Sequence, residues 1–168
     1  PVDVGARVAG CVSHGGAAEV VAVPWDRVYP LPTDLGFEEA AALPMNYLTA
    51  YYALVQRAGV HAGESVLVTG ATGGVGIATI QVARGLGCHV VALVSSEARR
   101  AAAEQAGAHA VVALDADPSP VAAVKAASSE GVDVAVDVVG GDVTDLLRCL
   151  RTFGRLMIVG FASGQIAT

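Results

Sequence analysis

The sequence predicts an α/β fold in which a doubly wound parallel sheet follows a smaller β segment. From Gly63 onward, short runs of valine, alanine and leucine alternate with helical patterns, which is the order of βαβ units. Most of these runs are apolar with little alternation, as expected when helices cover both faces of a sheet. A cluster of glycines between residues 70 and 76 also follows one such run and leads directly into a helical pattern.

The residues before Gly63 predict a small β segment. Gly5–Ala9 and Ala17–Val23 have the pattern of two short strands, joined by a turn at Gly15-Gly16. A stretch that contains several prolines follows, so this β segment is expected to end there.

A helical pattern then runs from Phe37 to Arg57. Pro44 lacks a backbone donor, so it is expected to divide this stretch into two helices. We place a domain boundary near Leu35, which gives residues 1–34 and 35–168 as the two predicted domains.

The predicted sheet has its strands and helices in strict alternation. The expected strands are Ser65–Val68, His89–Val94, Ala110–Ala113, Val132–Val138 and Arg155–Val159. The expected helices are Val75–Leu86, Glu97–Ala106, Pro120–Ser128 and Val143–Arg151. Parallel strands joined by helices are expected to have right-handed crossovers.

The composition excludes several classes of protein. With 168 residues and 54% hydrophobic content, the chain is long enough for one buried domain and part of another. The net charge of -6 argues against a nucleic-acid partner. No apolar run is long enough to predict a membrane span.

The cysteines favour a reducing compartment, and we expect the cytoplasm. Cys11, Cys88 and Cys149 are odd in number and widely separated, which argues against a disulfide framework. The chain begins with proline, so we expect a fragment, and a targeting peptide could precede it.

The glycine cluster has three interpretations. A P-loop would need Lys-Ser or Lys-Thr after the glycines, and neither is present. The run Thr69–Gly76 also resembles the short-chain dehydrogenase fingerprint, but that family has a Tyr-x-x-x-Lys motif downstream. Every tyrosine here precedes the glycines, so this interpretation is disfavoured.

The third interpretation is the dinucleotide turn G-x-G-x-x-G of a Rossmann sheet, with Ala71 in the first glycine position. In it, Gly73 lets the backbone approach a pyrophosphate and Gly76 lets the helix pack on the strand. The ligand would lie on the helix N-terminus. The candidate binding residues are Gly70, Ala71, Gly73, Gly74, Val75 and Gly76. The structural alternative is a tight turn without a ligand.

The residues after the second strand of the sheet favour NADPH over NADH. An acidic residue that would bind the ribose of NAD is absent from the end of this strand. Ser95 and Ser96 are able to donate hydrogen bonds to a 2′-phosphate, and Arg99 or Arg100 supplies positive charge. Two alternatives stay open: Glu97 reaches the ribose, or the arginines are only solvated.

Other catalytic chemistry is not indicated. Cys11 and His14 have a spacing that permits shared metal ligation, but no second pair completes a site. No metal is therefore expected. His61 and His109 lie in predicted turns, and no arrangement of serine, histidine and aspartate indicates a nucleophile.

Several motifs together resemble the zinc-independent quinone oxidoreductases of the medium-chain dehydrogenase/reductase superfamily. The motifs are Gly5-Ala6-Arg7-Val8, Gly15–Glu19, Ala40–Leu54, the glycine turn, Val94–Glu97, Val132–Gly141 and Gly154–Gly164. The resemblance covers essentially the whole chain, and Ala71–Gly76 is close to the Ala-x-Gly-Gly-Val-Gly form of that branch. It implies that residues 1–34 are the end of a GroES-like catalytic domain.

The same resemblance implies that zinc is absent. Zinc-dependent relatives carry a four-cysteine loop after the strand that resembles Gly5–Ala9, whereas this chain continues from Cys11 to Gly15 without it. They also carry a ligand cysteine where this chain has Met45 and Asn46.

The resemblance also implies roles for particular residues. Thr49 and Tyr52 are expected near the nicotinamide, Gly73–Val75 at the pyrophosphate, and Ser95 and Arg99 at the 2′-phosphate. Val139, Gly140, Gly160 and Phe161 are expected to line the nicotinamide ribose. One departure is Leu114, which replaces a tyrosine that is common in the family near the adenine or 2′-phosphate.

The implied reaction is hydride transfer from NADPH to a quinone or conjugated enone. Tyr51 or Tyr52 would donate a hydrogen bond to the acceptor oxygen, or solvent would protonate it. Alternatives are reduction of an enoyl thioester or alkenal, and a nucleotide-binding module without turnover. Family members are commonly dimers, so a homodimer is expected at full length.

Overall fold

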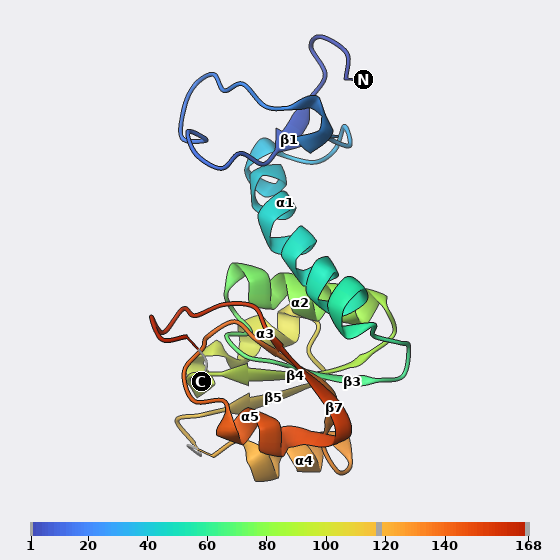
Figure 1. Ribbon diagram of the computed structural model, residues 1–168, viewed down its shortest axis with the longest axis vertical. Coiled ribbons are helices and arrows are strands. Elements are labelled where there is room, and N and C mark those ends of the chain that lie inside the picture. The colour runs from blue at the N-terminus through green and yellow to red at the C-terminus, as the bar shows by residue number, and fades with distance from the viewer. Residues whose placement is uncertain (1, 117–118, 167–168) are drawn as a thin grey trace. The chain divides into compact units, whose positions relative to one another are not determined.

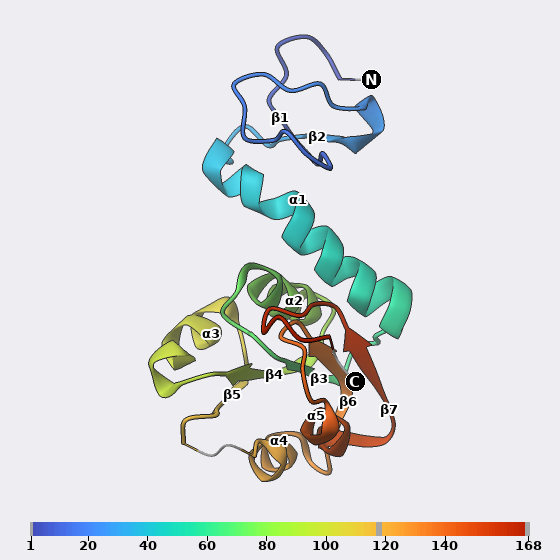
Figure 2. The same ribbon diagram turned by 60° about the vertical axis from the view of Figure 1, so that its left-hand side comes forward.

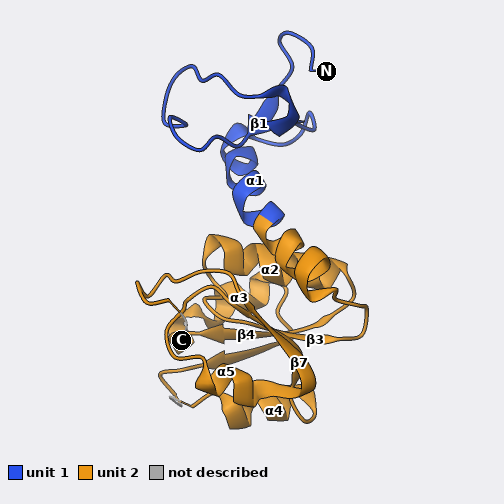
Figure 3. Ribbon diagram, viewed as in Figure 1, with its two compact units in different colours: residues 1–48 blue, residues 49–168 orange. Residues whose placement is uncertain are grey.

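The computed structural model describes residues 2–116 and 119–166. By their internal contacts, residues 1–48 and 49–168 form two compact units (Figure 3). The division falls inside a long helix, α1 (Phe37–Tyr51), which therefore contributes residues to both units (Figure 1).

The first unit contains a short antiparallel pair of strands. β1 (Val8–Gly10) pairs with β2 (Val28–Pro30), and η1 (Trp25–Arg27) is a single 3-10 turn before β2. Arg7, just before β1, donates a hydrogen bond to the Thr33 carbonyl at 2.9 Å, and its guanidinium lies 4.5 Å from the centre of the Phe37 ring. These contacts tie the β segment to the start of α1.

The predicted strand at Ala17–Val23 is wrong. These residues form no strand, and Val20 is 88% exposed, so this side chain gains little from burial. The partner of β1 comes later in the chain and ends at Pro30, although proline has no N–H to donate. Proline is tolerated there because each strand of a two-stranded sheet has one unpaired edge.

The predicted division at Pro44 is also wrong. α1 continues through Pro44, and a proline inside a helix removes one hydrogen bond without always ending the helix. The geometry changes later, where η2 (Tyr52–Ala58) continues as a π-helix and ends at Gly59 with a φ of 60°. The Val60 N–H closes this end with a hydrogen bond to the Leu54 carbonyl at 3.0 Å.

The second unit has the predicted parallel sheet, with five strands in the order β5-β4-β3-β6-β7. The strands are β3 (Ser65–Val68), β4 (His89–Val94), β5 (Ala110–Ala113), β6 (Val132–Asp137) and β7 (Leu150–Ile158). Every pairing between neighbours is parallel. The chain runs outward from β3 through β4 to β5 and then returns to the other side of β3. This reversal creates a topological switch point at the end of β3.

Helices cover both faces of this sheet, which confirms the doubly wound fold (Figure 2). The helices are α2 (Gly74–Gly85), α3 (Arg100–Ala106), α4 (Val121–Ser128) and α5 (Thr144–Cys149), and the turn η3 (Glu97–Arg99) precedes α3. On one face, α2, α3 and η2 pack against alternate strand residues such as Val68 and Val136. On the other, α4 and α5 pack against Leu67 and Ala135. The short apolar strands are therefore buried from both sides.

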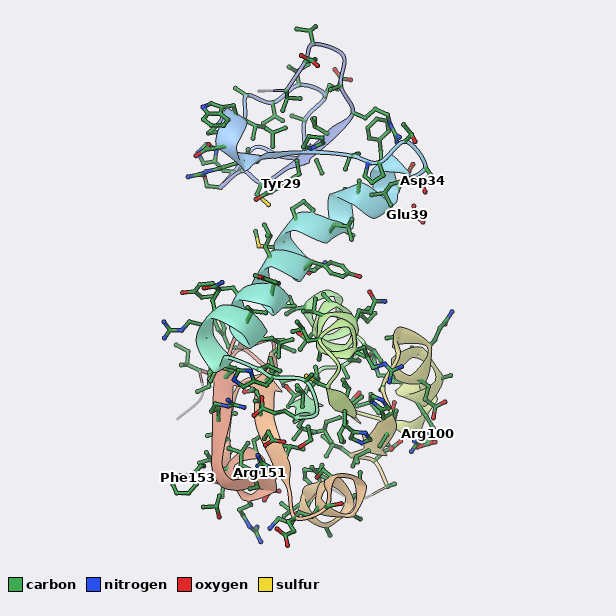
Figure 4. All side chains as sticks on the ribbon, turned by 90° about the vertical axis from the view of Figure 1, so that its right-hand side faces the viewer. Tyr29, Asp34, Glu39, Arg100, Arg151 and Phe153 are labelled. Atoms are coloured by element: carbon green, nitrogen blue, oxygen red, sulfur yellow. The ribbon has the colours of Figure 1, made fainter. Side chains whose placement is uncertain are left out.

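β7 begins earlier than predicted and contains an irregularity. It starts at Leu150, and its register with β6 shifts between Val132 and Val134. Phe153 lies in the shifted stretch with a φ of 65°, and its side chain is 98% exposed (Figure 4). A phenylalanine in the left-handed region is unusual, because its Cβ is crowded there.

Candidate nucleotide-binding site

A cleft of about 660 Å³ lies at the carboxyl ends of the strands in the second unit. Its wall includes the glycine turn after β3, the end of β4 and the loop after β6. Of the predicted site residues, the cleft brings together Gly70, Ala71, Gly73, Gly74, Val75, Gly76, Ser95, Arg99, Val139 and Gly140. Ligands of open α/β sheets bind at this edge, beside the switch point.

Glycines in the turn meet different structural needs. Gly70 has a φ of 53°, and a Cβ there would lie 2.8 Å from the Val138 side chain. A Cβ on Gly76 would lie 2.2 Å from the Gly70 carbonyl oxygen, so α2 approaches β3 only because this position has no side chain. A Cβ on Gly73 would meet only the Gly70 carbonyl oxygen, at 3.4 Å. Gly73 is therefore not required by packing, although it borders the cleft.

The N-terminus of α2 offers free backbone donors to the cleft. The first hydrogen bond of the helix runs from the Ile77 N–H to the Gly73 carbonyl at 2.8 Å. The N–H groups of Gly74, Val75 and Gly76 thus have no acceptor inside the helix, and no side chain caps them. A helix end of this kind favours an anion, because its dipole adds to the donors.

One arginine reaches the cleft from the segment after β4. Arg99 donates a hydrogen bond to Thr72 Oγ1 at 3.1 Å, so its guanidinium lies beside the glycine turn. Ser95 also borders the cleft, whereas Ser96 does not. This places one cation and one hydroxyl near each other at the β4 side of the glycine turn.

The neighbouring Arg100 is occupied elsewhere. Its guanidinium pairs with Glu97 and donates a hydrogen bond to the Val111 carbonyl at 2.9 Å. The hydrogen bond from Arg100 lowers the pKa of the Glu97 carboxyl, which keeps it ionised and paired. Neither side chain borders the cleft, so Arg99 is the arginine of this pair that does.

The wall of the cleft also contains apolar and acidic side chains. Leu114, Pro120 and Leu146 supply apolar surface, and Asp142 and Asp145 border the same space. Hydrogen bonds from the Thr144 side chain and from its backbone N–H, which donates to Asp142 at 2.8 Å, lower the pKa of the Asp142 carboxyl. Leu114, which replaces the tyrosine that is common in the resembling family, therefore lines the cleft.

The sequence analysis did not identify Asp137 and Thr69, which also border the cleft. Asp137 is 2% exposed and accepts a hydrogen bond from Thr69 Oγ1 at 2.7 Å. The spacing of polar residues was an available signal. Ser65 and Thr69 are separated by four positions, as are Asp133 and Asp137, and each pair encloses three apolar residues.

The other predicted site residues lie outside this cleft. Thr49 and Tyr52 border a second pocket of about 430 Å³ with the end of β7. Tyr51 is 49% exposed and borders neither space. Gly160 lies against the loop after β6, since its Cβ would be 2.8 Å from the Val138 carbonyl oxygen. Phe161 is exposed, and its Cα would be 2.9 Å from a Cβ on Gly140.

The cysteines do not contribute a reactive group to the cleft. Burial raises the pKa of the Cys149 thiol to about 11, and burial also raises the pKa of the Cys88 thiol. Within residues 2–116 and 119–166, no three histidine, cysteine or acidic side chains gather closely enough to hold a metal ion. None of the helices in these two stretches is both long and apolar enough to cross a membrane.

A doubly wound parallel sheet whose glycine turn and helix N-terminus face a cleft at the switch point defines a Rossmann-type domain. The chain belongs to the family described as zinc-binding dehydrogenases, whose model matches residues 74–167. Within the medium-chain dehydrogenase/reductase superfamily, its relatives and structural neighbours include quinone oxidoreductases, which confirms the resemblance.

Three similar proteins illustrate this relationship. Quinone oxidoreductase-like protein 2 of Bos taurus is 40% identical over 169 residues, which cover 99% of this chain and 48% of the relative. The quinone oxidoreductase of Thermus thermophilus, whose structures include a complex with NADPH, has a TM-score of 0.87 and 40% identity over 98% of this chain and 53% of its own. The CurK enoyl reductase has a TM-score of 0.67 and 30% identity over 80% of this chain and 42% of its own. The chain spans about half the length of the curated relatives it matches.

Proposed function

We propose that this chain supplies the nucleotide-binding part of an NADPH-dependent oxidoreductase that reduces a quinone or another conjugated carbonyl. The observation that carries the proposal is the cleft in which Arg99 lies beside the glycine turn and the free N–H groups of α2. The relative from Thermus thermophilus, a quinone oxidoreductase with a known NADPH complex, supports the same assignment.

The glycine turn fits the pyrophosphate of such a cofactor. Gly74, Val75 and Gly76 offer N–H donors without internal partners, and the helix dipole favours the negative charge. Gly73 leaves open the space at which the backbone would approach the phosphates. Gly70 and Ala71 hold the turn between β3 and α2.

The segment after β4 fits a 2′-phosphate. Arg99 supplies a charged donor and Ser95 a hydroxyl, both at the border of the cleft. Ser96 would contribute only through a backbone or side-chain movement toward the cleft. The pairing of Glu97 with Arg100 supports NADPH over NADH, because it holds the Glu97 carboxylate away from a ribose-binding role.

The loops after β6 and β7 fit the nicotinamide half. Val139 and Gly140 border the cleft on the side of β3 opposite Ser95. Gly160 and Phe161 pack on this loop, as the clashes with a Cβ on Gly160 or Gly140 show. Thr49 would approach the same end from the last turn of α1.

The bound cofactor would supply the hydride, and the protein would orient it and the acceptor. Tyr52 is the better candidate for a hydrogen-bond donor to the acceptor oxygen, because it borders a pocket with Thr49 whereas Tyr51 borders none. Replacement Tyr52→Phe is expected to lower kcat about a hundredfold, with Tyr51→Phe as the matched control. Unchanged kcat for Tyr52→Phe would assign protonation to solvent.

We further propose that the enzyme works without zinc, as a homodimer at full length, in the cytoplasm. Met45 and Asn46 stand where zinc-dependent relatives carry a ligand cysteine. The free thiols of Cys11, Cys88 and Cys149 fit a reducing compartment. Full activity after exhaustive chelation would support the zinc-free mechanism, and restoration of lost activity by zinc alone would overturn it.

The decisive experiment measures NADPH oxidation with a benzoquinone by the full-length gene product. Turnover that depends on both substrates is the expected result. Tight NADPH binding without turnover on any quinone or enone would contradict the enzymatic function and leave a nucleotide-binding module.

A second candidate reaction is reduction of an enoyl thioester or alkenal. The likeness to the CurK enoyl reductase favours it, and both reactions add hydride to a conjugated system. A panel of quinones, alkenals and enoyl thioesters separates the two by kcat/KM.

A further inference from the structure

We propose that Asp137 is a positioning residue that fixes the loop for the nicotinamide half of the cofactor. The inference rests on the proposed NADPH site and adds to it a residue that acts through its neighbours. Asp137 ends β6, at the border of the cleft, and its carboxylate is almost fully buried.

The carboxylate is held by donors from two walls of the cleft. Thr69, at the end of β3, donates its hydroxyl hydrogen to Oδ1 at 2.7 Å. From the loop after β6, the Val139 N–H donates to Oδ1 at 3.0 Å and the Gly140 N–H to Oδ2 at 3.1 Å. The Thr69 hydroxyl accepts in turn from the Val138 N–H at 3.0 Å. The glycine turn and this loop are therefore bound to one side chain.

No ion pair neutralises Asp137 within the part of the chain that the structure describes. A buried carboxylate is costly unless hydrogen bonds satisfy it, so the backbone donors of Val139 and Gly140 must point toward it. This requirement fixes the direction of the loop at the cleft. Gly140 adopts a φ of 77° there, a conformation that few other residues adopt.

The backbone of Asp137 extends the same arrangement to the loop after β7. Its carbonyl oxygen accepts from the Val159 N–H at 2.8 Å and from the Gly160 N–H at 3.2 Å. The loops that border or support the cleft on the β6 side thus converge on one residue. Ser95 and Arg99, which belong to the β4 side, are not among the partners of Asp137.

The order of the strands indicates that the two halves of a bound dinucleotide would lie on opposite sides of β3. β3 lies between β4 and β6, and the pyrophosphate would lie at the turn after β3. The half that carries the 2′-phosphate would extend toward Arg99, and the nicotinamide half toward Val139 and Gly140. The two loop donors, Val139 and Gly140, lie on the nicotinamide side, so disturbing Asp137 should weaken the binding of the nicotinamide half more than that of the half with the 2′-phosphate.

The chain contains a matched control at the opposite end of the same strands. Ser65 donates its hydroxyl hydrogen to Asp133 at 2.8 Å, and the two residues are 68 positions apart, as are Thr69 and Asp137. Asp133 is also buried and pairs with Arg151, but it does not border the cleft. Loss of its charge should affect stability without affecting cofactor binding.

The test compares Asp137→Asn with Asp133→Asn in the full-length gene product by isothermal titration calorimetry. The ligands are NADPH and adenosine 2′,5′-bisphosphate, which lacks the nicotinamide half. For Asp137→Asn, the Kd for NADPH should rise about tenfold or more, because the amide NH2 in place of Oδ2 cannot accept from the Gly140 N–H and would face it donor to donor. The Kd for the bisphosphate should stay within about twofold. At saturating NADPH, kcat should fall by a similar factor while the KM for the quinone changes little. Asp133→Asn should change none of these values more than about twofold.

A second pair of variants applies if Asp137→Asn does not fold. Thr69→Val removes the hydroxyl and should weaken NADPH about tenfold, whereas Thr69→Ser keeps the donor and should restore binding to within about threefold of the parent. Equal losses for NADPH and the bisphosphate, or no loss for NADPH, would overturn the role of Asp137. Absence of NADPH binding by the parent protein would instead contradict the proposed function itself.

Discussion

Arg99 donates a hydrogen bond to Thr72 at 3.1 Å, which joins the segment after β4 to the glycine turn after β3. The two residues come from different βα units, yet they border the same cleft. Arg100, the next residue, is committed to Glu97 and to the Val111 carbonyl. The doublet therefore divides into one arginine that faces the ligand space and one that stabilises the start of α3.

Arg99→Gln is expected to weaken NADPH much more than NADH. Loss of a charged hydrogen bond to the 2′-phosphate should cost on the order of 1.5–3 kcal/mol, whereas NADH has no group at that position. Calorimetric titration with both nucleotides measures the difference. Arg100→Gln is the matched control and should affect both nucleotides alike. Equal losses for both nucleotides in Arg99→Gln would contradict the choice of NADPH.

Gly73→Val should abolish nucleotide binding without unfolding the chain. A Cβ at this position meets only the Gly70 carbonyl oxygen at 3.4 Å, so the valine would fill the cleft and not the core. Gly76→Ala should instead destabilise the fold by about 1–3 kcal/mol, because its Cβ would overlap the turn. Urea unfolding and NADPH titration together separate the two effects.

Gly85→Ala serves as the control for these two variants. A Cβ on Gly85 would meet nothing within 4 Å beyond its chain neighbours and the backbone of its own helix, and Gly85 ends α2 at an exposed position. Alanine should stabilise the helix by about 0.5–1 kcal/mol and leave the nucleotide affinity unchanged. Retained NADPH affinity in Gly73→Val would refute the assignment of the pyrophosphate to this turn.

Phe153→Gly should stabilise the second unit. Relief of the left-handed conformation is worth about 1–2 kcal/mol, while the extra backbone freedom of glycine costs about 0.5–1 kcal/mol. The exposed ring contributes little burial to lose (Figure 4). Phe153→Ala, which removes the ring but keeps the Cβ, is the control. Urea unfolding that shows no difference between the two variants would argue against strain at this position.

His109→Gln should reduce the loss of stability at acidic pH. Burial, the Arg84 guanidinium and His89 lower the pKa of His109 below its ordinary value of 6.5, and its Nδ1 accepts from the Val90 N–H at 2.8 Å. The folded chain then binds this proton more weakly than the unfolded chain does, so protonation favours unfolding. Neutral His109 therefore makes its full contribution to the free energy of unfolding above about pH 6.5, and this contribution is lost as the pH falls below that value.

Urea unfolding of the parent and of His109→Gln at about pH 7.5 and about pH 5.5 measures this contribution. Arg84→Met, which removes the neighbouring cation, should make the loss of stability smaller, because the pKa of His109 in the folded chain then lies closer to its ordinary value. An identical pH dependence in the parent and in His109→Gln would show that another group is responsible.

The sheet and its glycine turn were predictable because local patterns determine them. Apolar strands of four to six residues and helices between them are readable from hydrophobic periodicity, and Gly76 marks a close approach that the structure confirms. The β segment was less predictable. Its second strand, Val28–Pro30, has no alternation to distinguish it, whereas the better pattern at Ala17–Val23 forms no strand and leaves Val20 88% exposed.

The residues of the candidate site were predictable only where they lie in the glycine motif or directly after a neighbouring strand. Ser95 and Arg99 could be assigned to the cleft because they follow a strand next to the glycine turn. Asp137 could not be recognised from its own neighbourhood, since its partner Thr69 is 68 positions away. Its role depends on the register between β3 and β6, which tertiary structure sets.

The position of β3 also has a consequence for the order in which the sheet folds during synthesis. As the chain leaves the ribosome, β3 finds β4 as the next strand, but its other edge stays unpaired until β6 has been synthesised. Half of the sheet is therefore able to form first, with the glycine turn already attached to α2. The closing of β6 against β3, which brings Asp137 to Thr69, completes the second wall of the cleft. A ribosome-stalled chain that ends before β6 should accordingly contain the turn but lack a finished pocket.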